Sequence, residues 1–348
     1  MDKWYEMPGK TGTNVIYSRI RLVRNLKEYP FPGRLTKEQS VELSEKLLGG
    51  LTGIASMDRM QYRFTHLERM GDLEKTALLE RRALNRSVMK KKDPTGMILS
   101  EGESTAILLN GDDHVRIQTL QTGLTLDRLY EKADRIDDYI GERFDYAFDE
   151  KYGYLTSFPT NVGTGLRAAV VLHLPMLSKN KNFSSLVADM GRFGTQVRGV
   201  YGEGAENFGS LYQISNQKTL GQTEQEIIDI VRKAALELDA QERRMRREYR
   251  QRKPVQAADE CYKSYGVLKY ARRLTRKDGM EFLSQIMTGI TDGILTVKEP
   301  CSVYGLMIGI QPANLLSLAD RPLDKDELDA ARAEFLRKRL PEIIEPEA

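Results

Sequence analysis

Residues 151–175 read Lys-Tyr-Gly-Tyr-Leu-Thr-Ser-Phe-Pro-Thr-Asn-Val-Gly-Thr-Gly-Leu-Arg-Ala-Ala-Val-Val-Leu-His-Leu-Pro and carry the most informative pattern in the chain. The run 166–174 is short, apolar and bounded by glycine and proline, which predicts a buried strand. In such a strand Arg167 shares one face with Ala169 and Val171. An unpaired buried charge is costly, so Arg167 belongs either to a structural pair with a carboxylate or to an anion-binding site.

A second pair of arginines lies near the N-terminus. Residues 18–22 alternate, with Ile20 and Leu22 on one face of a predicted strand and Arg19 and Arg21 on the other. The two guanidinium groups would project side by side, about 7 Å apart along the strand. Arginines of this kind are frequent on solvated edge strands, which is the simpler interpretation of this pair.

A predicted β-hairpin carries a further arginine. Asn110-Gly111 separates two apolar runs, which is a strong hairpin signal. In the returning strand Arg116 shares a polar face with His114 and Gln118. This pattern predicts either the wall of a polar site or a half-solvated antiparallel strand.

Composition excludes several classes of protein. The 348 residues have 40% hydrophobic and 30% charged side chains and a net charge of +3, which is ordinary for a globular protein and no sign of nucleic-acid binding. No apolar run approaches the ~20 residues of a membrane span, and the N-terminus lacks the apolar core of a signal peptide. Two cysteines and three scattered histidines argue against disulfides and zinc. We therefore expect a cytoplasmic protein without membrane, nucleic-acid or protein-bound metal sites.

The order of predicted elements indicates an α+β fold, with an antiparallel sheet flanked by helices and a helical C-terminal module. A capping box at Thr223 and Glu226 starts a long helix, and Pro254 ends it. We predict an α+β domain over residues 1–252, with a helical domain over 253–348. Further helices are expected at 36–55, 72–92, 125–148, 183–190 and 325–340, and strands at 97–119, 195–204 and 211–215.

Arginine side chains are the candidate phosphate ligands. Arg19, Arg21, Arg116, Arg167 and Arg198 all fall in strand-type segments, and the chain has neither a Walker A sequence nor a G-x-G-x-x-G that opens a helix. A polyphosphate would therefore be held by bidentate, charge-assisted hydrogen bonds from guanidinium groups. Such an arrangement suits phosphoryl transfer, which depends mostly on positioning and charge neutralisation.

Two carboxylates are candidates for the acceptor side of such a reaction. Asp112 lies in the predicted hairpin turn, and Glu203 is bracketed by glycines. Either carboxylate would bind a cationic acceptor and take its proton.

Four segments resemble the signature segments of the ATP:guanido phosphotransferases, the family of creatine and arginine kinases. They are residues 18–22, 113–116, 159–168 and 197–203, in the order and spacing of that family across roughly residues 14–250. The Val-Gly-Thr-Gly and Tyr-Gly-Glu-Gly segments and the helical C-terminal module resemble the bacterial protein-arginine kinases of the McsB type. The separate N-terminal helical domain of small-guanidine kinases is not expected here.

The resemblance implies that ATP and Mg²⁺ are bound, with magnesium held mainly by the nucleotide and water, and that Glu203 and Asp112 are catalytic. The implied ATP-binding residues are Tyr17, Ser18, Arg19, Ile20, Arg21, Arg82, His114, Arg116, Arg167, Ala168, Ala169, Val170, Val171, Arg198, Gly199, Val200, Tyr201, Gly202 and Glu203.

The chain departs from the family pattern mostly on the acceptor side. Asp112 is shorter than the expected glutamate by one C–C bond, about 1.5 Å. Phe158 replaces a reactive cysteine beside the acceptor, and Arg82 replaces a histidine that is often found near the adenine. All five phosphate-side arginines are retained, so ATP binding is better supported than transfer to an acceptor.

The C-terminal module contains a second, partial motif. Asp329 and Arg332 match the phosphoarginine-binding Arg-Asp-x-x-Arg-Ala motif of the branch, and Leu328 replaces its first arginine. The resemblance therefore implies a phosphoarginine site at Asp329 and Arg332.

The leading hypothesis is a protein-arginine kinase that phosphorylates exposed arginines of client proteins. By family analogy it would act in stress response and protein quality control, with an activator protein, Clp-type protease machinery and a homodimeric assembly. One alternative is a catalytically weakened adaptor that binds ATP or phosphoarginine, motivated by Phe158, Asp112 and Leu328. Another is a small-guanidine kinase acting on free arginine. Nucleic-acid binding through the basic runs 81–92 and 243–253 has the least support.

Overall fold

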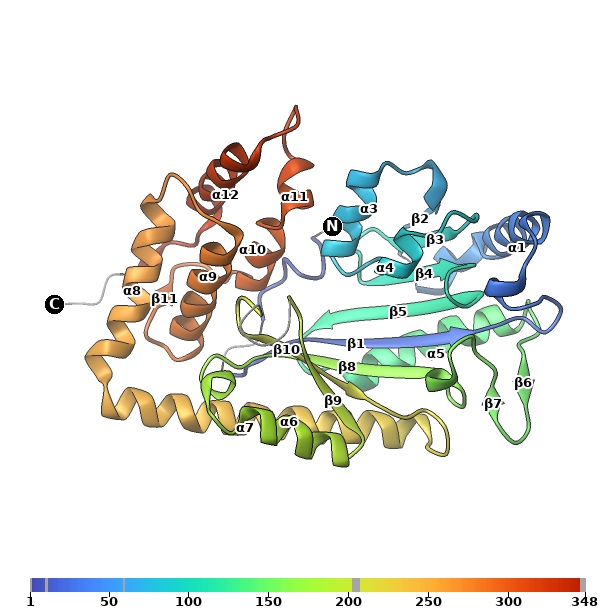
Figure 1. Cartoon of the computed structure of the whole chain (residues 1–348), viewed down its shortest axis with the longest axis horizontal. Helices are drawn as coiled ribbons and strands as arrows, with labels where there is room; N and C mark the ends of the chain where they lie inside the picture. The colour runs from blue at the N-terminus through green and yellow to red at the C-terminus, as the bar shows by residue number, and fades with distance from the viewer. Residues whose placement is uncertain (1, 10–11, 59, 202–206, 345–348) are drawn as a thin grey trace.

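The computed structural model describes residues 2–9, 12–58, 60–201 and 207–344, and its central layer is an eight-stranded antiparallel sheet (Figure 1). The strand order is β2-β3-β4-β5-β1-β8-β10-β9. The strands of this sheet are β1 (Val15–Arg24), β2 (Tyr62–His66), β3 (Gly96–Ser100), β4 (Thr105–Leu109), β5 (Val115–Thr122), β8 (Leu166–His173), β9 (Thr195–Gly199) and β10 (Leu211–Asn216). Two short ladders pair β6 (Phe148–Asp149) with β7 (Gly153–Tyr154) and β11 (Thr296–Val297) with β12 (Ile343–Ile344).

Helices flank the sheet and form the C-terminal module. The N-terminal part, which contains the eight-stranded sheet, has the helices α1 (Lys37–Gly50), α2 (Ala55–Asp58), α3 (Asp72–Glu80), α4 (Arg86–Met89), α5 (Leu126–Gly141), α6 (Phe183–Arg192) and α7 (Glu224–Arg252). The C-terminal module contains α8 (Pro254–Tyr270), α9 (Arg276–Thr291), α10 (Val303–Gly309), α11 (Pro312–Leu316) and α12 (Lys325–Arg339). Short 3₁₀ turns lie at Pro32–Arg34, Thr52–Ile54, Leu67–Arg69, Pro159–Asn161 and Leu177–Lys179. This arrangement confirms the predicted α+β class.

One face of the sheet supplies the main hydrophobic core. Ile20, Leu22, Ile117, Ala168 and Val170 are all buried there against the apolar sides of α1, α5 and α7. Figure 1 shows α6 and α7 running along this side of the sheet. Burial of this many aliphatic groups is the dominant favourable term that fixes the strand register.

On the opposite face of the sheet, two apolar clusters cover the two lateral parts. At one side Met97, Leu99 and Leu108 pack against α3 and α4. At the other, Tyr17 and Val171 join the core of the C-terminal module. The strip of sheet between these two clusters carries polar side chains.

β1 lies in the middle of the sheet, between β5 and β8. The simpler interpretation of Arg19 and Arg21, as residues of a solvated edge strand, is therefore wrong. The predicted alternation itself is confirmed, since Ile20 and Leu22 lie in the core on the other face.

Several predicted elements have different bounds in the structure. The helix expected at 72–92 is divided into α3 and α4 by a turn in which Arg82 adopts a φ of 71°. The segment 97–119 contains parts of three strands, and the helix expected at 125–148 ends at Gly141. Tertiary pairing and burial override local propensity at each of these places.

α7 connects the two parts of the chain and ends at the predicted domain boundary. Its capping box at Thr223 and Glu226 is present, and Pro254 occupies the first turn of α8, where its missing N–H costs nothing. Figure 1 shows α7 passing beneath the sheet to reach the C-terminal helices.

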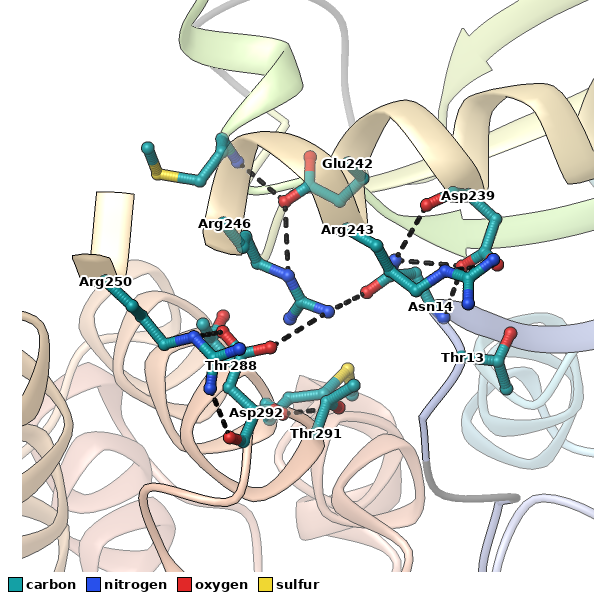
Figure 2. A network of polar contacts seen from close by, with 12 residues as sticks. Thr13, Asn14, Asp239, Glu242, Arg243, Arg246, Arg250, Thr288, Thr291 and Asp292 are labelled. Atoms are coloured by element: carbon teal, nitrogen blue, oxygen red, sulfur yellow. Dashed lines mark hydrogen bonds and ion pairs between the residues drawn. The ribbon is translucent and has the colours of Figure 1, made fainter. Parts of the chain in front are cut away.

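The end of α7 carries a buried polar network that joins both parts (Figure 2). Arg246 donates to the side-chain oxygen of Asn14, just before β1, and its Nη2 lies 3.4 Å from Asp292 Oδ1 after α9. Asp239 Oδ1 accepts hydrogen bonds from the backbone N and Nδ2 of Asn14 at 2.7 and 2.9 Å. Glu242 accepts the backbone N–H groups of Met176 and Leu177 at 3.1 and 2.8 Å.

This network makes the free energy of unfolding depend on pH. Burial raises the pKa of the Glu242 carboxyl from 4.5 to about 7, while the two backbone N–H donors and Arg246 oppose that rise and Asp292 adds to it. The pKa of Glu242 is higher in the folded protein than in the unfolded one. Its contribution to the free energy of unfolding is therefore full below pH 4.5 and is lost as pH rises through 7. The upper limit of the loss is about 3 kcal/mol.

We expect Glu242→Gln to flatten the pH dependence of unfolding between about pH 5 and 8, because glutamine does not titrate there. Denaturant unfolding at several pH values measures the slope. Glu237→Gln, an exposed position on the same helix, is the matched control and should keep the wild-type slope. Equal slopes for wild type and Glu242→Gln would contradict the assignment.

Candidate functional site

The strand register places the predicted phosphate-binding arginines on one side of the sheet. Arg21 in β1 lies directly opposite Arg167 in β8, and Val23, two residues on, lies opposite Arg116 in β5. Across β10, Arg198 of β9 lies opposite Gln213, whose Oε1 accepts from Arg19 Nη2 at 2.6 Å. We call the side of the sheet that carries these groups the arginine face; its members are Arg19, Arg21, Arg116, Arg167 and Arg198.

The arginine face concentrates positive charge in a desolvated place. Burial lowers the pKa of Arg21 well below its usual range, and the charges of Arg19, Arg116 and Arg167 lower it further. Burial, followed by repulsion from Arg19, lowers the pKa of Arg116 to about 10. Like charges at this density are destabilising by themselves, and a bound polyanion would relieve their repulsion.

Unsatisfied donors indicate the same ligand chemistry. The Nε atoms of Arg19, Arg21 and Arg116 are buried and have no hydrogen-bond partner among the described residues. A buried donor without a partner costs on the order of 1–3 kcal/mol. Phosphate oxygens would satisfy these donors and neutralise the charge at the same time.

Arg167 is held by neutral acceptors. Its Nε donates to Asn161 Oδ1 at 3.0 Å, and its Nη atoms donate to the backbone oxygens of Thr160, Asn216 and Gln217. No ion pair involves Arg167 in the part of the chain that the structure describes. The described residues therefore provide no structural carboxylate pair for Arg167, and its part in an anion-binding site stays a prediction.

Asp112 lies in the loop between β4 and β5, and Phe158 lies in the segment between β7 and β8. Asp112 Oδ2 accepts hydrogen bonds from Asn85 Nδ2 and Ser87 Oγ at 2.8 and 2.7 Å, and Asp112 also acts electrostatically on Arg116. The neighbouring Asp113 is buried and accepts from the backbone N of Ser157 at 2.7 Å, which fixes the segment that contains the half-exposed Phe158.

Asp113 is a site-building residue that the sequence analysis did not single out. Its Oδ1 also accepts from Asn25 Nδ2 at 2.8 Å, and burial raises its pKa. Gln213 and Asn161, which orient arginines, were missed as well. The hydrogen-bond partners of both residues lie on other strands or loops. The one sequence signal was the position of Gln213 on the polar side of the predicted strand 211–215.

His114 has both ring nitrogens engaged away from a ligand. Nδ1 accepts the backbone N–H of Leu26 at 2.9 Å, and Nε2, as the protonated nitrogen, donates to the carbonyl of Pro30 at 3.0 Å. Burial lowers its pKa to about 4, so the ring is neutral. The structure thus gives His114 the role of holding residues 26–30 and leaves neither nitrogen for the nucleotide predicted beside it.

The remaining ATP-binding residues predicted on β1 and β8 lie on two different faces of the sheet. Ser18, Ile20, Ala168 and Val170 point to the helical side of the sheet, where Ser18 Oγ donates to Gly123 O at 2.7 Å. Their side chains cannot reach a ligand on the arginine face, because successive residues of a strand point to opposite sides. Tyr17, Ala169 and Val171 lie on the arginine side, where Tyr17 and Val171 pack against the C-terminal module.

The structure describes only some of the predicted ATP-binding residues at the end of β9. Gly199 closes the strand and Val200 N donates to Leu211 O at 3.0 Å. Tyr201 lies under the guanidinium of Arg82, 4.7 Å from ring centroid to Cζ. Gly202 and Glu203 lie outside the described residues.

The predicted phosphoarginine pair is buried inside the C-terminal module. Arg332 Nη1 donates to Asp329 Oδ1 at 2.6 Å and to Leu274 O at 2.7 Å, and its Nε donates to Ile310 O. Only 1% of Arg332 is exposed. In this structure the pair ties α12 to the loop before α9 and to the end of α10, and its ligand-binding role stays a prediction.

In the described part of the chain, no group of three or more His, Cys, Asp or Glu side chains is arranged to hold a metal ion.

An antiparallel sheet with arginines from four strands on one face defines a phosphagen-kinase type of catalytic domain. The duplicated taurocyamine kinase of Schistosoma mansoni, solved with bound transition-state analogue components, superposes with a TM-score of 0.60 at 26% identity, covering 68% of this chain and 34% of that longer one.

The chain belongs to the ATP:guanido phosphotransferase family. The description "ATP:guanido phosphotransferase, C-terminal catalytic domain" matches residues 46–245, and "Protein-arginine kinase McsB C-terminal domain" matches residues 254–348. The protein-arginine kinase of Halothermothrix orenii is 35% identical over 340 residues, 98% of this chain and 97% of that protein. That of Caldanaerobacter subterraneus is 39% identical over 329 residues, 94% and 96% of the two chains. Membership of this kinase family implies ATP as a substrate.

We expect Arg21→Met to stabilise the ligand-free protein and to weaken ATP binding. Removing one buried like charge relieves repulsion by about 1–2 kcal/mol, whereas the loss of charge-assisted bonds weakens binding about 10–100-fold. Thermal unfolding with and without Mg-ATP measures both effects. The control is Arg247→Met, an exposed arginine of α7, which should change neither. A variant less stable than wild type without nucleotide would contradict the electrostatic argument.

Proposed function

We propose that this chain is a protein-arginine kinase, which transfers the γ-phosphoryl group of Mg-ATP to arginine side chains of client proteins. The observation that carries the proposal is the arginine face, where buried guanidinium donors of β1 and β5 lack partners among the described residues. Relatives of nearly equal length that bear this name support the choice of a protein as acceptor.

The arginine face binds the phosphate chain and neutralises charge on its oxygens during transfer. Arg167 and Arg19, whose guanidinium groups are fixed by Asn161 and Gln213, give the face a geometry that needs little reorganisation when ATP binds. Magnesium enters as part of the Mg-ATP substrate and supplies further charge neutralisation.

On the acceptor side, a carboxylate binds the client guanidinium and takes one of its protons. A guanidino nitrogen then forms the new N–P bond while the P–O bond to the β-phosphate breaks, and ADP leaves with that electron pair. Glu203 and Asp112 are the proposed proton acceptors. Asp112 is anchored by Asn85 and Ser87 through one oxygen, which leaves Oδ1 to face the acceptor.

On the acceptor side, the half-exposed side chain of Phe158 is apolar. The cysteine that the family has at this position is ionisable. A phenyl ring packs against the methylene stem of arginine and against the face of its guanidinium. We assign Phe158 to client binding, without a part in proton transfer.

The cellular setting is proposed by family analogy. The kinase would act in the cytoplasm in stress response and protein quality control, as a homodimer, with an activator protein and Clp-type protease machinery as partners. Asp329 and Arg332 remain the proposed phosphoarginine-binding pair. Within the described residues the structure contains no helix with the length and apolar character needed to cross a membrane.

The decisive experiment incubates the protein with Mg-ATP and an unfolded, arginine-rich client. Acid-labile phosphate on arginine, located by mass spectrometry and absent with Glu203→Ala, is the expected result. ATP binding without any transfer would instead support the adaptor function, for which Phe158 and the shortened Asp112 are the motivating residues. Faster turnover of free arginine than of the client would support a small-guanidine kinase.

We expect Asp112→Asn to lower kcat for client phosphorylation about 10²-fold and to leave the Kd for ATP within about twofold, because the change affects the acceptor side. The amide oxygen can still accept from Asn85 and Ser87, so the loop should keep its conformation. Steady-state kinetics and nucleotide titration separate the two quantities. An unchanged kcat would remove Asp112 from the reaction.

A further inference from the structure

Exposed aromatic side chains gather on the short β6–β7 hairpin and on the segment that follows it. Phe148 is 58% exposed, Tyr152 46% and Phe158 50%. Single apolar residues are common on protein surfaces, but several large aromatic rings along one short stretch of chain are typical of an interaction site. We call this stretch, residues 145–158, the hairpin surface.

The hairpin surface is fixed at its base, although its rings are exposed. The backbone N of Ala147 donates to the carbonyl of Asn25 at 2.7 Å. The ring of Tyr154 contacts both the guanidinium of Arg24, whose Cζ lies 3.5 Å from the ring centroid, and the ring of Phe148, at 5.2 Å between centroids. Figure 1 shows β6 and β7 projecting beside the end of the main sheet. The exposed rings are therefore carried by a defined backbone conformation.

The hairpin surface adjoins the arginine face. Phe158 lies two residues before Thr160, whose carbonyl accepts from Arg167 Nη2 at 3.0 Å. The next residue, Asn161, accepts from Arg167 Nε at 3.0 Å. An extended polypeptide bound on the hairpin surface would therefore pass within a few residues' length of the phosphate-binding arginines.

The hairpin surface carries negative charge, in contrast to the arginine face. Residues 145–158 contain three carboxylates and one basic side chain. Asp145 and Glu150 are exposed and form no ion pair with another described residue. The one basic group, Lys151, lies over the ring of Tyr152, with Nζ 5.1 Å from the ring centroid. This surface therefore already holds a cation against an aromatic ring.

These features fit a cationic polypeptide with apolar side chains. Guanidinium groups bind the faces of aromatic rings and pair with carboxylates. A nucleic acid would be repelled by the carboxylates of this surface. The arginine face by itself repels a cationic acceptor, and a negative surface beside it would offset that repulsion during the encounter.

We propose that the hairpin surface is the docking site for an unfolded, arginine-containing segment of the client protein. Phe148 and Tyr152 supply the aromatic contacts, and Asp145 and Glu150 supply the charged ones. The inference rests on the proposed function and deepens it, because it names the part of the chain that favours a polypeptide over free arginine. A docked segment contacts both the hairpin surface and the acceptor side, whereas free arginine contacts only the acceptor side.

The first test measures binding of a fluorescently labelled, unstructured, arginine-rich peptide by fluorescence anisotropy in the absence of nucleotide. Phe148→Ser combined with Tyr152→Ser should raise the Kd for the peptide about 5–30-fold, because each exposed cation–π contact contributes a factor of about 2–5. The control is Tyr270→Ser, an exposed tyrosine of α8, which should bind the peptide like wild type. Equal Kd values for the double variant and this control would overturn the proposal.

Asp145→Asn combined with Glu150→Gln tests the charges separately and keeps the size of both side chains. This variant should raise the Kd for the same peptide about 2–5-fold at low salt, and its difference from wild type should disappear at high salt, because salt screens exposed charges. Glu237→Gln, an exposed position on α7, is the control and should keep the wild-type Kd at both salt concentrations. A Kd equal to that of wild type at low salt would contradict the role of the carboxylates.

Kinetics of client phosphorylation separate this inference from the proposed function. Phe148→Ser with Tyr152→Ser should raise KM for an unfolded client and leave kcat and the Kd for ATP within about twofold of wild type. Weaker peptide binding in this variant would support docking even if wild type transferred no phosphate, an outcome that refutes only the proposed function. Phosphate transfer with an unchanged KM would overturn the docking inference alone. A changed oligomeric state with unchanged peptide binding would also overturn it and assign the surface to contact between copies of this chain.

Discussion

Five guanidinium groups held on one side of a sheet repel one another, and the packing of the other side keeps them there. Ile20 and Leu22 of β1 and Val170 of β8 are buried on the helical side, and the strict alternation of a strand then directs Arg19 and Arg21 to the opposite side. A slip of one residue would exchange the two sets and bury charge in the main core. The hydrophobic core therefore stabilises an arrangement that electrostatics alone would disperse, and an anionic substrate compensates the charge.

The groups around the arginine face orient its guanidinium groups and add little charge of their own. Arg167 is oriented by an amide and three backbone carbonyls, and Arg19 by Gln213, and among the described residues neither guanidinium forms an ion pair with a carboxylate. Neutral acceptors align the donors and leave the positive potential intact for the substrate. His114 likewise fixes geometry without adding charge, because both nitrogens of its neutral ring hydrogen-bond to the backbone of residues 26–30.

The C-terminal module is connected to the catalytic part at several separate places. Arg246 joins Asn14 and Asp292 in a buried polar network, and Glu80 caps α11. The aromatic contact of Tyr17 with Tyr304 adds an apolar connection next to the arginine face. These polar and apolar contacts join the module firmly to the sheet beside the arginine face.

Local sequence patterns alone determined the α+β class, the side of the sheet on which Arg19, Arg21 and Arg167 lie, and the start of α7 at its capping box, because alternation and capping act between near neighbours. Tertiary structure alone decided that β1 is a central strand, that His114 is occupied and that Arg332 is buried. It also decided that Asp113 holds Asn25 and the backbone of Ser157, and that Gln213 orients Arg19. The sheet order and most partners of these side chains depend on pairings between segments far apart in the chain, which only packing of the whole domain selects.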